Sequence, residues 1–354
     1  MTLEPILQTM IEASASDLYL VEGCSPMLRV EGVTRAVDGA LPLSGSDLDA
    51  LLGEALNEAQ RREFTLAREL NLSLARSGLG RFRVNCYRTL GAVGMVIRRV
   101  RGEIPTLEGL GLPAILKDLA LERQGLVLVV GATGVGKSTT LGAMIEHRNA
   151  HLPGHIITIE DPIEFLHAHK QSVISQREVG IDTVSYDAAL ANALRQAPDV
   201  ILIGELRETT TVAVALHAAE TGHLVLSTLH ATNAGQAVER LIHFFPPEGQ
   251  QAVLLQISMA LKAIIAQRLV PGADGKGLVA AVEIMLVTPR IQALVRRGEL
   301  EGLRTAIEEG IQEGLQTFDQ ALFALYREGK VTAEEAVRFA DSPNNLRLRI
   351  KGIR

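Results

Sequence analysis

The sequence predicts an α/β protein, in which a largely parallel sheet is flanked by helices and is preceded by a smaller α+β domain. Two observations predict this. Four short apolar runs, at 126–130, 156–159, 200–203 and 224–226, do not alternate with polar residues, and each is followed by a helical pattern. Strands of this kind are buried on both faces of a parallel sheet. The first hundred residues instead show short strands with alternating polarity and hairpin signals.

Composition narrows the possible classes of protein. The chain has 354 residues, of which 47% are hydrophobic, enough for two domains with proper cores. Its formal net charge of −6 speaks against a nucleic-acid partner, because such binding rests on neutralising phosphates. Two cysteines cannot form a disulfide framework. The N-terminus lacks the basic region of a signal peptide, and no apolar run is long enough for a membrane span. We therefore expect a cytoplasmic protein with no membrane span.

Two segments of the first hundred residues predict an antiparallel sheet. Residues 26–37 form a strand–turn–strand pattern with the turn at Glu31-Gly32. Residues 80–89, GRFRVNCYRT, alternate strictly, so that Phe82, Val84 and Cys86 share one face. If that face is buried, the arginines between these residues are exposed on the other. Cys86 and Cys24 are interpreted as packing residues.

Domain boundaries follow from the breaks in pattern. We expect an N-terminal domain at 1–100, a linker at 101–113 with two prolines and three glycines, and a second domain at 114–354 that is helical from about 290. The tail at 343–354 has four basic residues and no acidic one, with leucines alternating with arginines. A solvated basic tail is one interpretation, and strand addition to a partner or docking on a partner is the other.

A glycine-rich segment, GATGVGKS at 131–138, matches the pattern G-x-x-x-x-G-K-[ST]. It follows the apolar run 126–130 and opens a helical stretch from 138 to about 148, which is the context a phosphate-binding loop requires. Its glycines let backbone N–H groups face phosphate oxygens, and the alternative is a βα turn without a ligand. We expect nucleoside triphosphate binding, with Lys137 on the β- and γ-phosphates and Ser138 on Mg²⁺. The predicted binding residues are Gly131, Ala132, Thr133, Gly134, Val135, Gly136, Lys137, Ser138 and Thr139.

Acidic residues follow two further apolar runs. They lie at the carboxyl ends of the predicted parallel strands, which is where open α/β sheets bind their ligands. The run 200–203 leads into Gly204 and Glu205, and Glu205 has the reach to orient or deprotonate an attacking water. The run 156–159 leads into Glu160, Asp161 and Glu164, which we expect to position water and Mg²⁺. Glu205 and Asp161 are also candidate Mg²⁺ ligands. The alternative is that these acids cap the helices that follow.

Two histidines flank the run 224–226. An unbroken strand would separate His223 from His230 by about 23 Å, so both cannot contact one phosphate. His230 lies at the carboxyl end, where a sensor of the γ-phosphate belongs. His223 is a candidate nucleotide contact or a structural histidine. Asn233 and Gln236 are expected to cap a helix that runs toward His243.

Four segments together resemble the secretion ATPase superfamily. The glycine-rich loop, ITIEDPIE (157–164), APDVILIGELR (197–207) and TGHLVLSTLHATNA (221–234) occur in the order of its Walker A, Asp box, Walker B and His box. Within the superfamily the chain looks like the type IV pilus retraction ATPases of the PilT/PilU type. HFFP (243–246), VPGADGKG (270–277) and ADSPNNLRLRIK (340–351) look more like the PilU branch.

The resemblance implies a PAS-like N-terminal domain, a RecA-like ATPase domain and a ring hexamer that uses ATP and Mg²⁺ for pilus retraction and twitching motility. It implies a pilus platform membrane protein as partner, at the cytoplasmic face of the inner membrane. It also implies that N-terminal arginines neutralise phosphate charge, for which Arg81, Arg83 and Arg98 are the candidates; a solvated strand face is the alternative.

Two other functions compete with that expectation. Assembly and secretion relatives usually carry a four-cysteine insertion, which two cysteines cannot provide. The other alternative is an accessory subunit that binds nucleotide and assists a PilT-type partner; TPRIQALV (288–295), which departs from the AIRNLI motif of PilT relatives, favours it.

Overall fold

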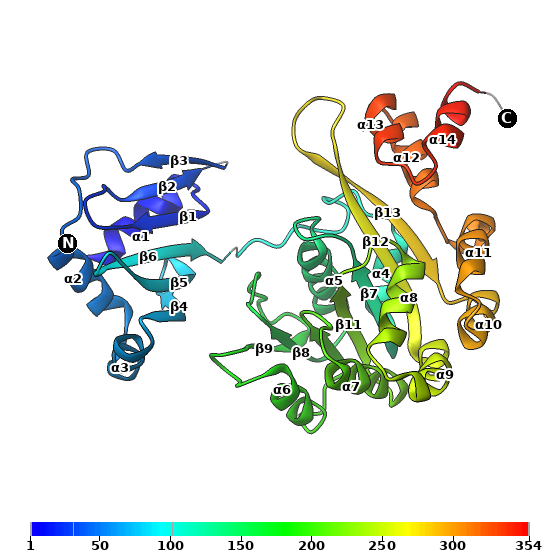
Figure 1. Ribbon diagram of the computed structural model, residues 1–354, viewed down its shortest axis with the longest axis horizontal. Coiled ribbons are helices and arrows are strands. Elements are labelled where there is room, and N and C mark those ends of the chain that lie inside the picture. The colour runs from blue at the N-terminus through cyan, green and yellow to red at the C-terminus, as the bar shows by residue number, and fades with distance from the viewer. Residues whose placement is uncertain (1, 31, 101, 353–354) are drawn as a thin grey trace. The chain divides into compact units, whose positions relative to one another are not determined.

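The computed structural model describes residues 2–30, 32–100 and 102–352, and these divide into two compact units (Figure 1). Unit 1 consists of the residues up to Glu103 together with Glu164–Leu166. Unit 2 consists of Ile104–Ile163 and the residues from His167 onward. Among the described helices, none combines the length and the apolar character that crossing a membrane requires.

Unit 1 is a strand-rich α+β unit. Its six strands pair antiparallel in the order β3-β2-β1-β6-β5-β4, and apolar faces of the helices pack on one side of this sheet. The hairpin expected at 26–37 is present as β2 and β3, while Glu31 of its turn lies outside the described residues. The elements are α1 (Leu3–Glu12), β1 (Asp17–Leu20), β2 (Met27–Val30), β3 (Val33–Ala36), α2 (Gly45–Ala55), α3 (Glu58–Ala67), β4 (Glu69–Arg76), β5 (Gly80–Thr89) and β6 (Ala92–Arg99).

The alternation predicted for β5 is confirmed on its apolar face. Phe82, Val84 and Cys86 are buried, and burial raises the pKa of the Cys86 thiol to about 12. The expected exposure of Arg81 and Arg83 is wrong, because both are half-buried between the flanking strands β4 and β6. Cys24 is exposed, so it is not the packing residue that we expected.

Unit 2 is built on a seven-stranded sheet in the order β13-β12-β7-β11-β10-β8-β9. All neighbours are parallel except β12 and β13, so the predicted α/β class with a largely parallel sheet is confirmed. Strands β9, β12 and β13 extend this sheet beyond the four predicted runs. The strands are β7 (Gly125–Val130), β8 (Gly154–Glu160), β9 (Ser172–Glu178), β10 (Val200–Ile203), β11 (Leu224–Leu229), β12 (Leu261–Pro271) and β13 (Leu278–Leu286).

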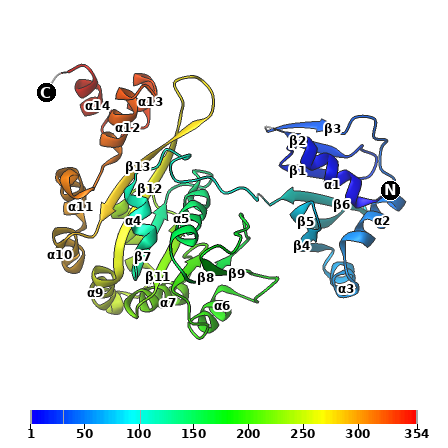
Figure 2. The same ribbon diagram turned by 180° about the vertical axis from the view of Figure 1, so that it is seen from behind.

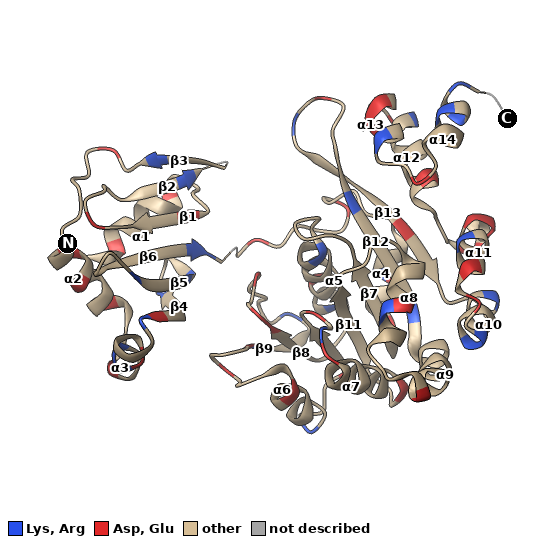
Figure 3. Cartoon of the chain, viewed as in Figure 1, with Lys and Arg blue, Asp and Glu red and all other residues tan. Residues whose placement is uncertain are grey.

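Two helical layers cover the sheet (Figure 1 and Figure 2). Val127 and Val129 of β7 pack in one core with α4 and α5, whereas Leu126 and Leu128 pack in the other core with α6 to α9. Burial on both faces explains why β7 is continuously apolar and why neither β7 nor β11 contains a charged residue, and Figure 3 colours β7 tan, as an uncharged segment. The helices are α4 (Ile115–Leu121), α5 (Lys137–His151), α6 (Tyr186–Ala193), α7 (Thr209–Glu220), α8 (Ala234–His243) and α9 (Gln250–Ala260).

The boundary between the units falls within the segment for which we expect a linker. Residues from Ile104 to Ile163 belong to unit 2, where Leu107 and Leu112 are buried in the core that also contains α4. These two leucines give the segment apolar anchors despite its prolines and glycines.

From Pro289 onward the described chain is helical, as predicted. The tail forms the helix α14, so the interpretation of 343–354 as a strand that adds to a partner is wrong. Pro343 occupies the first turn, where it favours a helix, and Leu346 is buried against the preceding helices. The elements are α10 (Pro289–Arg297), α11 (Leu303–Glu309), α12 (Phe318–Arg327), α13 (Ala333–Arg338) and α14 (Pro343–Ile350), with short 3₁₀ turns between them.

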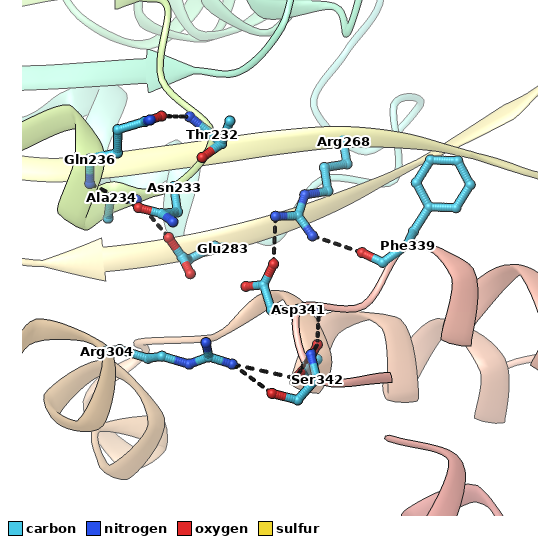
Figure 4. Close-up of polar contacts among 11 residues, drawn as sticks. Thr232, Asn233, Ala234, Gln236, Arg268, Glu283, Arg304, Phe339, Asp341 and Ser342 are labelled. Atoms are coloured by element: carbon cyan, nitrogen blue, oxygen red, sulfur yellow. Dashed lines mark hydrogen bonds and ion pairs between the residues drawn. The ribbon is translucent and has the colours of Figure 1, made fainter. Parts of the chain in front are cut away.

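Arg268 of β12 holds these C-terminal helices to the sheet (Figure 4). Its guanidinium donates to the carbonyl oxygen of Phe339 at 2.7 Å and pairs with Asp341 at 2.6 Å. It also lies 3.8 Å from the ring centroid of Phe318.

Candidate nucleotide-binding site

The loop at 131–136 joins β7 to α5, and the strand–loop–helix context predicted for it is present. Gly131, Gly134 and Gly136 have φ values of +151°, +82° and +88°, a region that glycine adopts without steric cost. Helix α5 begins at Lys137, directly after the loop, and no side chain caps it. Its first N–H groups and its positive end are therefore available to an anion.

Lys137 folds back over the loop. Its ammonium group donates to the carbonyl oxygens of Gly131 at 3.0 Å and Ala132 at 2.8 Å. Ser138 and Thr139 follow in the first turn of α5 and are half-buried. A cation at the loop and a hydroxyl at the helix start suit a triphosphate with Mg²⁺, so the residues present fit this ligand.

Glu205 and His230 meet at the same edge of the sheet. Glu205 follows β10, His230 follows β11, and the Nε2 atom of His230 lies 3.0 Å from Oε1 of Glu205. The other carboxylate oxygen of Glu205 accepts from Nε of Arg207 at 2.8 Å and from its terminal nitrogen at 2.7 Å. This hydrogen bond raises the pKa of the Arg207 guanidinium. Glu205 is thus held by two side chains and does not cap a helix.

The sheet order explains why these residues converge. Strand β11 lies between β7 and β10, so His230 lies between the glycine-rich loop and Glu205 along the carboxyl edge. Neighbouring strands are about 4.8 Å apart, which places the loop and the start of the Glu205 segment about 10 Å apart. That separation is short enough for a triphosphate to span.

Two hydroxyl groups of β11 hold the turn that carries Glu205. The buried Ser227 donates to the carbonyl oxygen of Ile203, and Thr228 donates to that of Gly204, each at 2.7 Å. The N–H of Leu206 donates to the carbonyl oxygen of Thr228 at 3.0 Å. The sequence analysis missed both hydroxyls, although two adjacent polar residues in an otherwise apolar strand were a signal for them.

Glu160 and Asp161 lie one strand further from the loop, at the end of β8. Oε1 of Glu160 accepts from Thr158 at 2.7 Å, and the element that follows β8 is the strand β9 rather than a helix. Tyr186, which the sequence analysis also missed, lies close by. Burial and then the charge of Asp161 raise the pKa of its hydroxyl well above the ordinary value. A Cβ at Gly204 would lie 2.9 Å from this hydroxyl oxygen, so glycine permits the close approach.

The remaining residues of this predicted set are His223 and Glu164. His223 precedes β11 at its amino end, where Nδ1 lies 3.0 Å from the carbonyl oxygen of Ala218. The six residues of β11 separate His223 from His230 and from the carboxyl edge of the sheet. Glu164 is exposed and belongs to the segment that groups with unit 1.

The candidate arginines share one face of the unit 1 sheet. Arg83 of β5 lies opposite Arg98 of β6 in the antiparallel register, and Arg81 is two residues from Arg83. Nε of Arg98 pairs with Asp17 at 2.7 Å, and Nε of Arg81 donates to Ser73. Figure 3 shows the basic residues on β2, β3 and β6 of this unit.

Helix α8, which follows His230, has two caps at its N-terminus (Figure 4). The predicted cap by Asn233 is confirmed, with its side-chain oxygen accepting from the N–H of Gln236 at 2.8 Å. Glu283 of β13 accepts from the N–H of Ala234 at 2.7 Å. Burial raises the pKa of Glu283 to about 7. The segment after His230 is therefore anchored to the sheet by a carboxyl group.

Comparison with known proteins identifies the family of this chain. The family model described as Type II/IV secretion system protein matches residues 68–276, which include the loop, Glu205 and His230. The chain belongs to this family. It is 50% identical to the type IV pilus ATPase PilU of Pseudomonas aeruginosa over 99% of this chain and 92% of that protein. It is 39% identical to a twitching motility protein of Neisseria gonorrhoeae over 96% of this chain and 91% of the relative.

A solved structure of the same family shares the fold. The crystal structure of the pilus retraction motor PilT with bound ADP matches 98% of both chains with a TM-score of 0.91 and 38% identity. The family members PilU and PilT therefore resemble this chain in sequence and in architecture, so the resemblance to PilT/PilU-type ATPases is confirmed.

Proposed function

We propose that this chain is an ATP-hydrolysing motor for type IV pilus retraction and twitching motility. The observation that carries the proposal is the alignment of the glycine-rich loop, His230 and Glu205 along one sheet edge, with Glu205 within 3.0 Å of His230. The likeness to PilU, to a twitching motility protein and to the ADP-bound structure of PilT supports the same function.

The proposed roles follow from position. The N–H groups of the loop and of the first turn of α5 bind the phosphates, and Lys137 moves from the loop carbonyls to the β- and γ-phosphates. The Ser138 hydroxyl would hold Mg²⁺, and the ion would supply positive charge next to the phosphates. Glu205 orients the attacking water and accepts its proton, and His230 reports the presence of the γ-phosphate to α8. Asp161 and Glu160 polarise and position water at the side of the site that is farther from the loop.

The remaining proposals concern assembly. The chain acts in the cytoplasm as a ring hexamer against a pilus platform protein at the inner membrane. Arg81, Arg83 and Arg98 of unit 1 stabilise phosphate charge, and their common sheet face supports this joint role. Hydrolysis moves the two units relative to each other by a hinge near residues 101–113.

Purified protein tests the enzymatic part of the proposal. We expect Mg²⁺-dependent release of phosphate from ATP by the full chain and none by Lys137→Ala, with the exposed Lys276→Ala as the matched control. Phosphate release by the wild-type chain that equals that of Lys137→Ala would contradict the ATPase.

A second candidate function is an accessory subunit that binds nucleotide and assists a PilT-type ATPase. The sequence TPRIQALV, which forms the start of α10, favours it, because it departs from the motif of PilT relatives. Cells that lack this chain distinguish the two functions. If the chain is an independent motor, returning it to these cells should restore retraction without a PilT-type partner. If it is an accessory subunit, it should restore retraction only when that partner is present.

A further inference from the structure

Gln267 lies against the glycine-rich loop although it is far from it in sequence. Strand β12 runs parallel to β7 with Ala266 opposite Val130, so the next residue, Gln267, lies beside the start of the loop. Its side chain is only 5% exposed. A Cβ at Gly131 would lie 2.7 Å from the backbone carbonyl oxygen of Gln267, so the loop packs directly against this residue.

Both ends of the Gln267 amide are engaged. Its Nε2 atom donates to the carbonyl oxygen of Val135 in the loop at 2.7 Å. Its Oε1 atom accepts from the buried hydroxyl of Thr140 in the first turn of α5 at 2.8 Å. The orientation of the amide follows from these partners, because the Val135 carbonyl can only accept while the hydroxyl can donate.

The contact with Val135 determines the orientation of one peptide group. The carbonyl of Val135 and the N–H of Gly136 belong to the same planar trans peptide and point in opposite directions. Holding the carbonyl toward the Gln267 side chain therefore directs the Gly136 N–H away from that side chain. Glycine at both 134 and 136 has positive φ, so this peptide has few other constraints on rotation.

We propose that Gln267 is a positioning residue that preorganises the loop for phosphate by fixing the Val135–Gly136 peptide. The inference rests on the proposed nucleotide binding and adds to it a residue outside the four family segments. Preorganisation lowers the conformational cost of binding, so the contribution of Gln267 is to nucleotide affinity rather than to the chemical step.

The substitution Gln267→Glu gives a readout that a merely structural role would not give. Burial of the introduced carboxyl raises its pKa. The carboxyl is therefore protonated at the low end of the pH range and ionised at the high end. When protonated it can donate to the Val135 carbonyl, and when ionised it has no proton to donate and repels that oxygen. The affinity of the variant for nucleotide should therefore fall as pH rises, while that of the wild-type chain stays nearly constant.

The experiment measures the Kd of the full chain for a fluorescent N-methylanthraniloyl derivative of ADP between about pH 6 and about pH 9. We expect Gln267→Glu to bind within about threefold of wild type at the low end and about tenfold more weakly at the high end, and Gln267→Met to bind about tenfold more weakly throughout. Thr140→Val removes only the other contact of the amide and should leave Kd within about threefold at every pH. Melting temperatures at each pH verify that the variants are folded. If Gln267→Met does not fold, the pH dependence of Gln267→Glu, which conserves volume, tests the proposal by itself.

Three outcomes would overturn the inference: wild-type affinity in both Gln267 variants, a pH profile of Gln267→Glu parallel to that of wild type, or a loss in Thr140→Val equal to that in Gln267→Met. Failure of the proposed function has a different signature. In that case the wild-type chain itself binds no nucleotide, or binds it no more tightly than Lys137→Ala does.

Discussion

The imidazole of His230 contacts the carboxylate of Glu205 at 3.0 Å, across the neighbouring strands β11 and β10. The Glu205 side chain is 17% exposed and that of His230 is 38% exposed, so the pair faces solvent at the edge of the sheet. The end of β11, which carries His230, is also next to the end of β7, where the glycine-rich loop begins. The contact therefore links the proposed base to the proposed phosphate sensor.

Glu205→Gln should lower the rate of ATP hydrolysis by about 10²- to 10⁴-fold, because an amide cannot accept the proton of the attacking water. Nucleotide affinity should stay within about threefold of wild type, since the loop is unchanged. Steady-state phosphate release and fluorescent-nucleotide binding measure the two effects. Glu208→Gln, three residues further along and exposed, is the matched control and should retain wild-type turnover. Turnover in Glu205→Gln equal to that of this control would exclude Glu205 as the base.

Thr228→Val should lower both stability and turnover. The substitution removes the hydroxyl that donates to the Gly204 carbonyl, and leaving that acceptor unpaired should lower the free energy of unfolding by about 1–3 kcal/mol. Because Glu205 follows Gly204 directly, kcat should fall severalfold while the KM for ATP stays unchanged. Chemical denaturation and steady-state kinetics test this, with the exposed Thr232→Val as control. A change in KM alone would contradict the assigned role of Thr228.

Gly131→Ala should impair the loop much more than Gly134→Ala. The added methyl group at 131 would lie 2.7 Å from a backbone oxygen that cannot rotate away, and the residue would keep a φ of +151°. At 134 the methyl group meets nothing within 4 Å, so only the positive φ costs about 1 kcal/mol. We expect nucleotide affinity to fall more than about tenfold in Gly131→Ala only. Equal affinities in the two variants would show that the approach of β12 does not restrict the loop.

Glu283 should make stability depend on pH. Its pKa is about 7 in the folded chain and 4.5 as the ordinary value, so the folded state holds a proton that the unfolded state has released between these pH values. The free energy of unfolding should therefore fall as pH rises from about 4.5 to about 7. Burial is the main cause, Asp341 adds to it, and Ala234, Arg268 and Arg304 oppose it.

Glu283→Gln should remove this part of the pH dependence. The amide oxygen can still accept from Ala234 without carrying a buried charge, so at about pH 8 the variant should be about 1–3 kcal/mol more stable than wild type. Denaturation at several pH values measures the difference, and Glu301→Gln, on an exposed neighbouring turn, is the control. A pH dependence unchanged from wild type would contradict the buried position of Glu283.

Local patterns in the sequence were sufficient for much of the fold and part of the site. The strand at 200–203 and the loop before Lys137 can be predicted from a few adjacent residues. A continuous apolar run indicates burial on both faces, and the glycine-rich motif indicates a phosphate-binding turn. The strand interpretation of the tail at 343–354 was wrong because six residues, 346–351, alternate by chance as a strand does, whereas Leu346 needs the neighbouring helices to define its buried side.

The sequence by itself determined the phosphate loop, the acidic strand ends and the α/β class. Only the tertiary structure decided which of these residues meet: His230 with Glu205, Gln267 with Val135, and Glu283 with the start of α8. It also separated His223 from His230 by the length of β11. The physical reason is that sheet order brings together residues more than a hundred positions apart, as for Gln267 and Val135, and local periodicity carries no record of that order.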